Sequence, residues 1–136
     1  MSRARSLTSV IAALYFGALV GLAFVPGSAA NRASALWPFL LFVPVGILLV
    51  LLLGTRRWWS ALGFGVLGAA WLEAAQTIWM PVGYADAWDV VWASTGVAIG
   101  VSGIVLGVRM QRRSMRSHGA PSIVAQGGTR EIPRAE

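Results

Sequence analysis

Four apolar stretches, each long enough to cross a lipid bilayer as an α-helix, dominate this sequence. They cover residues 7–25, about 36–53, 58 to about 80 and about 90–108. A spanning helix needs about 20 mostly apolar residues, and these stretches are apolar on nearly every face, unlike soluble helices. Only 12% of the 136 residues are charged, about half the usual fraction of a soluble domain. We therefore predict an all-α integral membrane protein that forms a four-helix bundle.

The first stretch has a second interpretation, as a secretory signal peptide. It follows Arg3 and Arg5 and is followed by Ser28-Ala29-Ala30, small residues of the kind found at cleavage sites. The apolar part of a signal peptide is usually about 7–15 residues long, and this stretch is longer. Its length favours a retained membrane helix, whereas cleavage would leave three spans.

The arginines predict which ends of the spans face the cytoplasm. They cluster before the first span, between the second and third at Arg56 and Arg57, and after the fourth at residues 109–116. The other two connections carry Arg32 alone and Asp86 with Asp89. Because Lys and Arg concentrate in cytoplasmic loops, we expect a multi-pass plasma membrane protein with both termini cytoplasmic. Residues 1–110 would form the membrane domain, and residues 111–136 a flexible basic cytoplasmic tail.

One polar cluster accompanies the third and fourth spans and supplies the candidate binding residues Glu73, Gln76, Tyr84, Asp86 and Asp89. Glu73 lies roughly 10 Å inside the end of its span, and a carboxylate at such a depth is a functional candidate by default. Gln76 shares its helix face. We expect Glu73 to point into the bundle, toward the fourth span.

Each of these residues also has a purely structural interpretation. Glu73 and Gln76 could simply hydrogen-bond between helices, and Tyr84 could anchor the chain at the membrane interface. Asp89 could cap the fourth helix, while Asp86 would be a solvated loop residue. We expect Gln76, a tryptophan N–H or Ser94 to be the partner of Glu73.

The composition restricts the available chemistry. The chain has no Cys, and its one His, His118, follows the last span. These counts exclude a disulfide framework, a thiol nucleophile, a thiolate metal site and a His cluster. We expect no metal and no cofactor. The net charge of +6 comes from arginines beside the apolar spans, which suits anionic lipid rather than nucleic acid.

Small residues indicate where helices meet, because they let backbones approach closely in lipid. Three G-x-x-x-G pairs occur: Gly17 with Gly21, Gly96 with Gly100, and Gly103 with Gly107. The glycine density of the fourth span predicts that it is the most buried helix. Pro44 lacks a backbone donor and is expected to kink the second span.

The residues of the polar cluster resemble the VanZ-like family of small bacterial membrane proteins. The resemblance covers about residues 36–108 and is carried by Glu73-x-x-Gln76, Pro81, Trp88-Asp89-Val90-Val91, Gly96, Gly100 and the Phe42-Val43-Pro44-Val45-Gly46 stretch. Three positions depart from the family pattern. Gly83 stands about where the family has an Arg, and Ala93 and Pro38 stand where it has Asn.

The resemblance implies an association with the bacterial cell envelope and with glycopeptide (teicoplanin) resistance, without implying a reaction. Our first hypothesis is a non-enzymatic protein with an outward-facing polar site between the third and fourth spans. Its partners would be membrane lipids, a lipid-linked envelope precursor or an antibiotic, and it could form a homo-oligomer.

The alternative hypothesis is an intramembrane enzyme that acts on a lipid-linked substrate, with Glu73 and Asp89 as its catalytic acid and base. The lack of a His, a Cys or a phosphate-binding glycine loop among the spans disfavours this alternative. A transporter or proton path is a third hypothesis, which a single carboxylate deep in the membrane supports weakly.

Overall fold

The computed structural model describes residues 3–25, 36–79 and 86–118, with side chains described over 5–25, 36–79 and 86–115. Four α-helices follow one another: α1 (Arg3–Ala23), α2 (Leu36–Leu53), α3 (Trp58–Trp79) and α4 (Ala87–His118). Each helix is long and apolar enough to cross a membrane. The protein is therefore, by the length and composition of its helices, a multi-pass membrane protein, as the sequence predicts.

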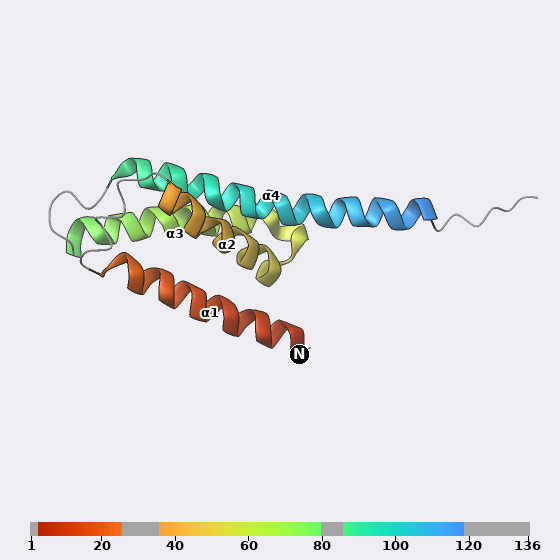
Figure 1. Ribbon diagram of the computed structural model, residues 1–136, viewed down its shortest axis with the longest axis horizontal. Coiled ribbons are helices and arrows are strands. Elements are labelled where there is room, and N and C mark those ends of the chain that lie inside the picture. The colour runs from red at the N-terminus through yellow and green to blue at the C-terminus, as the bar shows by residue number, and fades with distance from the viewer. Residues whose placement is uncertain (1–2, 26–35, 80–85, 119–136) are drawn as a thin grey trace, which may run out of the picture.

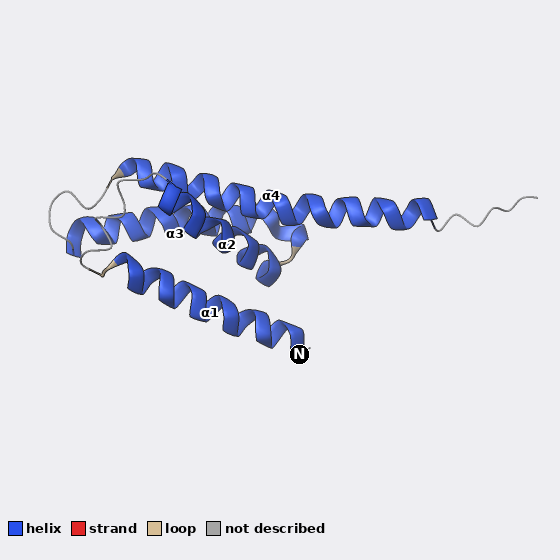
Figure 2. Cartoon of the chain, in the orientation of Figure 1, coloured by secondary structure: helices blue, strands red, loops and turns tan. Residues whose placement is uncertain are grey.

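The helices run up and down, so that their polar ends gather at two opposite ends of the bundle (Figures 1 and 2). We call the end that carries Glu73, Asp86 and Asp89 the acidic end. The end that carries Arg56, Arg57 and the last part of α4 is the arginine end. Backbone groups inside a bilayer have no water to bond, which is why these apolar stretches form helices.

The turn between α2 and α3 shows how the chain reverses at the arginine end. Gly54 has a φ of +86°, a conformation that favours glycine because a side chain would be strained there. Its N–H donates to the Val50 carbonyl at 2.7 Å, and Arg57 N–H donates to the Gly54 carbonyl at 3.0 Å. The 3-10 helix η2 (Thr55–Arg57) follows and leads directly into α3.

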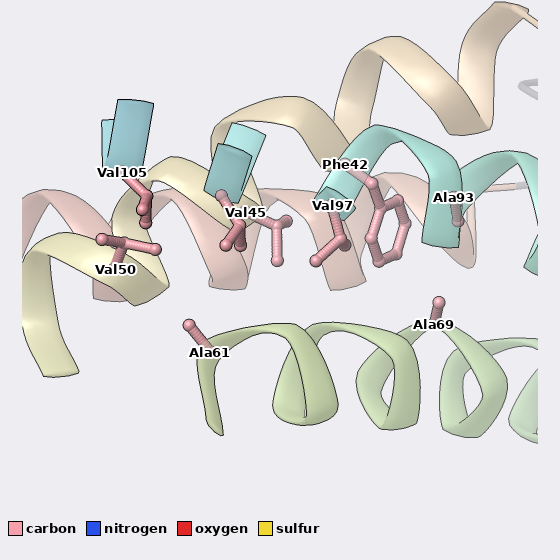
Figure 3. Close-up of a cluster of buried hydrophobic side chains, with 9 residues drawn as sticks. Phe42, Val45, Val50, Ala61, Ala69, Ala93, Val97 and Val105 are labelled. Atoms are coloured by element: carbon pink, nitrogen blue, oxygen red, sulfur yellow. The ribbon is translucent and has the colours of Figure 1, made fainter. Parts of the chain in front are cut away.

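The core is built mainly by α2, α3 and α4. Figure 3 shows Phe42, Val45 and Val50 of α2 facing Ala93, Val97 and Val105 of α4, with Ala61 and Ala69 of α3 pointing toward them. The side chains from α3 and that of Ala93 of α4 are small, which allows the helices to approach closely. The prediction that the fourth span is the most buried helix is confirmed, because 33% of the most apolar part of α4 is buried, the highest share of the four helices.

Only some of the predicted glycine contacts form. A methyl group at Gly96 or Gly100 would collide with the backbone carbonyls of Phe39 and Val43 of α2, respectively, and one at Gly46 would collide with the Val97 carbonyl of α4. By contrast, added methyl groups at Gly17, Gly21, Gly103 and Gly107 would meet open space. Of the three predicted pairs, Gly96 with Gly100 is thus the one that lets α2 and α4 pack together.

Helix α1 is the least buried of the four, with 11% of its most apolar window inside the protein. It packs on α2 and α3, on the side of the bundle away from α4 (Figure 1). The Tyr15 hydroxyl donates to the Leu41 carbonyl at 2.6 Å. This bond ties the middle of α1 to α2, whose Pro44 interrupts the helical hydrogen bonds at about the same level.

Helix α4 is longer than predicted at both ends. It begins at Ala87 and continues to His118, so residues 111–118, which the sequence analysis assigned to the flexible tail, are helical. It projects beyond the other helices at the arginine end (Figure 1), where Arg109, Arg112 and Arg113 are exposed. The remaining tail, residues 119–136, and the signal-like Ser28-Ala29-Ala30 lie outside the described residues.

Candidate functional site

A polar cavity lies at the acidic end and is lined by all four helices. It has a volume of about 160 Å³. Its polar lining comes from Glu73, Gln76 and Asp89, and the rest is apolar: Leu19, Leu22, Ala23, Trp37, Pro38, Leu41, Phe42, Ala69, Leu72 and Ala93. From the sequence, we predicted a site between the third and fourth spans alone. The structure adds α1 and α2 to its walls, because α1 and α2 meet α3 beside the same polar residues.

Glu73 is part-buried and lines this cavity together with Asp89 and Ala93 of α4. It therefore faces α4, as predicted, although its partner differs from the expected ones. Glu73 Oε1 accepts the backbone N–H of Asp86 at 2.6 Å. Residues at the start of a helix have N–H groups without partners in that helix. A carboxylate from α3 thus helps to fix the beginning of α4.

Asp86 takes the capping role that the sequence suggested for Asp89. Because α4 begins at Ala87, Asp86 takes the capping position, and its Oδ1 accepts the Trp88 N–H at 3.0 Å. The expectation that Asp86 is a solvated loop residue is correct only in that its side chain is exposed. Asp89 lies in the first turn of α4, where its charge suits the helix dipole, and it lines the cavity.

Gln76 is the one buried polar residue among those described, with 3% of its surface exposed. Its Nε2 donates to the Ala23 carbonyl at 3.0 Å, so it bonds α1 rather than Glu73. Near the C-terminus of α1, the Gly21 and Leu22 carbonyls accept the N–H groups of Phe24 and Val25. The side chain of Gln76 supplies the donor for the next carbonyl, at a helix end that lacks intrahelical donors.

The other amide atom of Gln76 has no such partner. Gln76 Oε1 is buried and accepts no hydrogen bond within the described part of the chain. A buried polar atom without a partner costs about 1–3 kcal/mol, and such atoms in native proteins call for an explanation. Exchanging the amide atoms would set Oε1 against the Ala23 carbonyl, so the observed orientation is the favourable one. This atom therefore marks a place for a hydrogen-bond donor.

The cavity also contains two positions at which the sequence departs from the family pattern. Pro38 and Ala93, which stand where the resemblance expects Asn, both line it. The third departure, Gly83, and the binding candidate Tyr84 lie outside the described residues. Within residues 3–25, 36–79 and 86–118, no group of three or more His, Cys, Asp or Glu residues is placed to hold a metal ion.

A second hollow adjoins the polar cavity on the side of the arginine end, and we call it the apolar groove. It lies between α1 and α3 over α2 and has a volume of about 230 Å³. Its walls are Phe16, Leu19, Val20, Phe42, Val45, Leu49, Phe64, Gly65, Gly68, Trp71 and Leu72. This groove was not predicted from the sequence. The one signal for it is Trp71, a large side chain that lies exposed in the middle of α3 and lines the groove.

Comparison with known proteins identifies one related group. A family model described as VanZ/LLP1 matches residues 21–108, which is more than half of the chain. The matched segment includes Glu73, Gln76 and Asp89 and begins within α1, earlier than the resemblance in the sequence suggested. Searches of curated proteins and of solved structures gave no match.

Proposed function

The chain belongs to the VanZ/LLP1 family, and we propose that this member binds the polar end of a lipid-linked envelope molecule or of an antibiotic in the polar cavity. The observation that carries the proposal is the convergence of Glu73, Gln76 and Asp89 on one cavity. Ionisable residues in spanning segments are costly and mark binding sites or ion pathways.

The proposed setting is the bacterial plasma membrane, with the acidic end facing outward and both termini in the cytoplasm. The arginine clusters support this orientation, because Arg56, Arg57, Arg109, Arg112 and Arg113 all lie at the opposite end. An outward-facing cavity has access to envelope precursors and to antibiotics that arrive from outside. This access supports the proposed link to antibiotic resistance.

Bound lipids test the proposal directly. We expect the chain, purified with lipids from a bacterial membrane, to keep a lipid-sized adduct in native mass spectrometry. The double variant Glu73→Gln/Asp89→Asn should lose most of it, whereas Thr95→Val should keep it. Thr95 is a suitable control because its hydroxyl is exposed on α4 and bonds the Val91 carbonyl of its own helix. Equal adducts in all three proteins would refute binding in the cavity.

The enzymatic alternative rests on the two carboxylates that line the same cavity. One could act as acid and the other as base if their environments separate their pKa values. The same preparation distinguishes the two functions, because an enzyme would convert its bound lipid during incubation. Recovery of the adduct with an unchanged mass favours binding, and a time-dependent change of mass that Glu73→Gln abolishes favours catalysis.

A further inference from the structure

The polar cavity and the apolar groove adjoin each other. They share three lining residues: Leu19 of α1, Phe42 of α2 and Leu72 of α3. From the cavity to the groove, the lining moves toward the arginine end along α1, α2 and α3 alike. A ligand whose head lies beside Gln76 can therefore extend along the groove without leaving the protein surface.

The groove fits a hydrocarbon chain in both chemistry and length. Its walls carry no charged side chain, and its one polar group is the indole N–H of Trp71. Lipid tails are as apolar as these walls. In a membrane, the hydrophobic effect therefore does not favour closing the groove over filling it with a lipid chain. From Gln76 to Phe64 the path follows 12 residues of α3, or about 18 Å. One leaflet of the hydrocarbon core is about 15 Å thick.

The charge of the polar cavity favours one kind of head group, because both charged side chains in its described lining are carboxylates. The Gln76 Nε2 group is already used by the Ala23 carbonyl, which leaves the buried Oε1 as an acceptor. Glu73 and Asp89 each bring a carboxyl group to the lining, and a carboxyl group that is ionised only accepts hydrogen bonds. The arginines whose side chains the structure describes, from Arg5 to Arg113, lie at the other end of the bundle. The described side chains would thus repel a phosphate or carboxylate head group and hold a cation with N–H donors.

We infer that the ligand is an amine-bearing lipid, with its ammonium group in the polar cavity and one hydrocarbon chain in the apolar groove. This inference rests on the proposed function, to which it adds the class of ligand. The ammonium group donates to Gln76 Oε1 and to the two carboxylates, and charge-assisted hydrogen bonds of this kind are the strong ones. Trp37 also lines the cavity, and an aromatic ring can attract a cation that lies over its face.

Three amphiphiles with the same chain and different heads test the inference: octadecylamine, octadecanoic acid and octadecanol. Their binding to the purified full chain is measured by native mass spectrometry at neutral pH. We expect the amine to bind at least about tenfold more tightly than the acid, as one charge-assisted hydrogen bond can provide. Glu73→Gln/Asp89→Asn should remove this preference and leave the binding of octadecanol unchanged.

The groove is tested by filling it. A side chain at Gly68 would enter open space in the groove, and one at Gly63 would enter open space elsewhere on α3. Gly68→Leu should weaken the binding of all three amphiphiles by about tenfold. This is the effect expected when apolar contacts equivalent to one buried side chain are lost. Gly68→Ala should weaken them less, and the matched control Gly63→Leu should weaken none.

The outcomes separate the inference from the proposed function. If Gly68→Leu has no effect while the carboxylate variant still loses its ligand, the hydrocarbon chain does not bind in the groove, but binding of the head group in the polar cavity is supported. If the acid binds as well as the amine, the inference that the head group is an amine is wrong. If neither the carboxylate variant nor Gly68→Leu changes the binding of any amphiphile or of membrane lipid, both the inference and the proposed function fail.

Discussion

At the scale of single residues, the polar side chains of the acidic end serve the ends of neighbouring helices. Glu73 accepts the Asp86 N–H at the start of α4, and Gln76 donates to the Ala23 carbonyl at the end of α1. Helix ends leave such groups without intrahelical partners, and these two side chains supply partners for them. The same residues therefore hold the helices in place and line the cavity.

Substitutions of Glu73 separate its hydrogen bond from its charge. Glu73→Gln keeps an oxygen that can accept the Asp86 N–H, so we expect little change in folding. Glu73→Leu leaves this N–H without its acceptor and should lower the free energy of unfolding by about 1 kcal/mol or more. Thermal unfolding in detergent, followed by circular dichroism, measures both variants. Equal stability of Glu73→Leu and the natural chain would show that this bond contributes nothing.

At the scale of helices, the contact between α2 and α4 organises the bundle. The sequence contains three G-x-x-x-G pairs, but only Gly96 with Gly100 meets another backbone. The motif alone could not reveal this, because a helix that is apolar on every face gives no sign of which face meets a partner. The choice depends on the register between two helices, to which Gly46 on α2 also contributes.

Alanine substitutions in α4 test this assignment with a matched pair. Gly100→Ala should destabilise the protein by about 1–3 kcal/mol, because its methyl group collides with the backbone of α2. Gly103→Ala meets open space and should be neutral, or stabilising by up to about 1 kcal/mol, through the higher helix propensity of alanine. Thermal unfolding in one detergent compares them. The opposite order of stability would contradict the packing described for α2 and α4.

The retention of α1 is a separate prediction at this scale. Leu19, Leu22 and Ala23 of α1 line the polar cavity, so cleavage after Ala30 would remove one of its walls. We expect the mature chain to begin at or near Met1. Intact-mass measurement of protein from bacterial cells decides this, with protein made without membranes as the uncleaved control. A mature chain beginning at Asn31 would show that the first span is a signal peptide.

At the scale of the whole molecule, the sequence predicted the number of spans and most of their bounds. Residues 36–53 were assigned correctly, because apolar length alone defines a span. The extension of α4 to His118 was missed, since its residues are polar and a helix outside the membrane needs no apolar run. Glu73, Gln76 and Asp89 were predicted to share one polar site, and all three line the polar cavity. The walls that α1 and α2 contribute depend on packing that no local pattern encodes.

The arginines at one end of the bundle predict its orientation in the membrane. Helix α4 has 32 residues and a length of about 48 Å, so it cannot fit within a hydrocarbon core of about 30 Å. Arg109, Arg112 and Arg113 lie on its protruding part, at the same end as Arg56 and Arg57. Arginines are retained on the cytoplasmic side, and we therefore expect both termini in the cytoplasm.

Reporter fusions measure this orientation. A reporter fused after Glu136 should be active only if it is a type that works in the cytoplasm, and one inserted in residues 83–86 should be active only if it works outside. Replacing two arginines supplies the control. With Arg56 and Arg57 changed to Gln, the activities of both reporters should stay the same, because the arginine cluster after α4 still opposes inversion. If a reporter after Glu136 were active only outside the cytoplasm, the orientation would be the opposite of the predicted one, with the polar cavity on the cytoplasmic side.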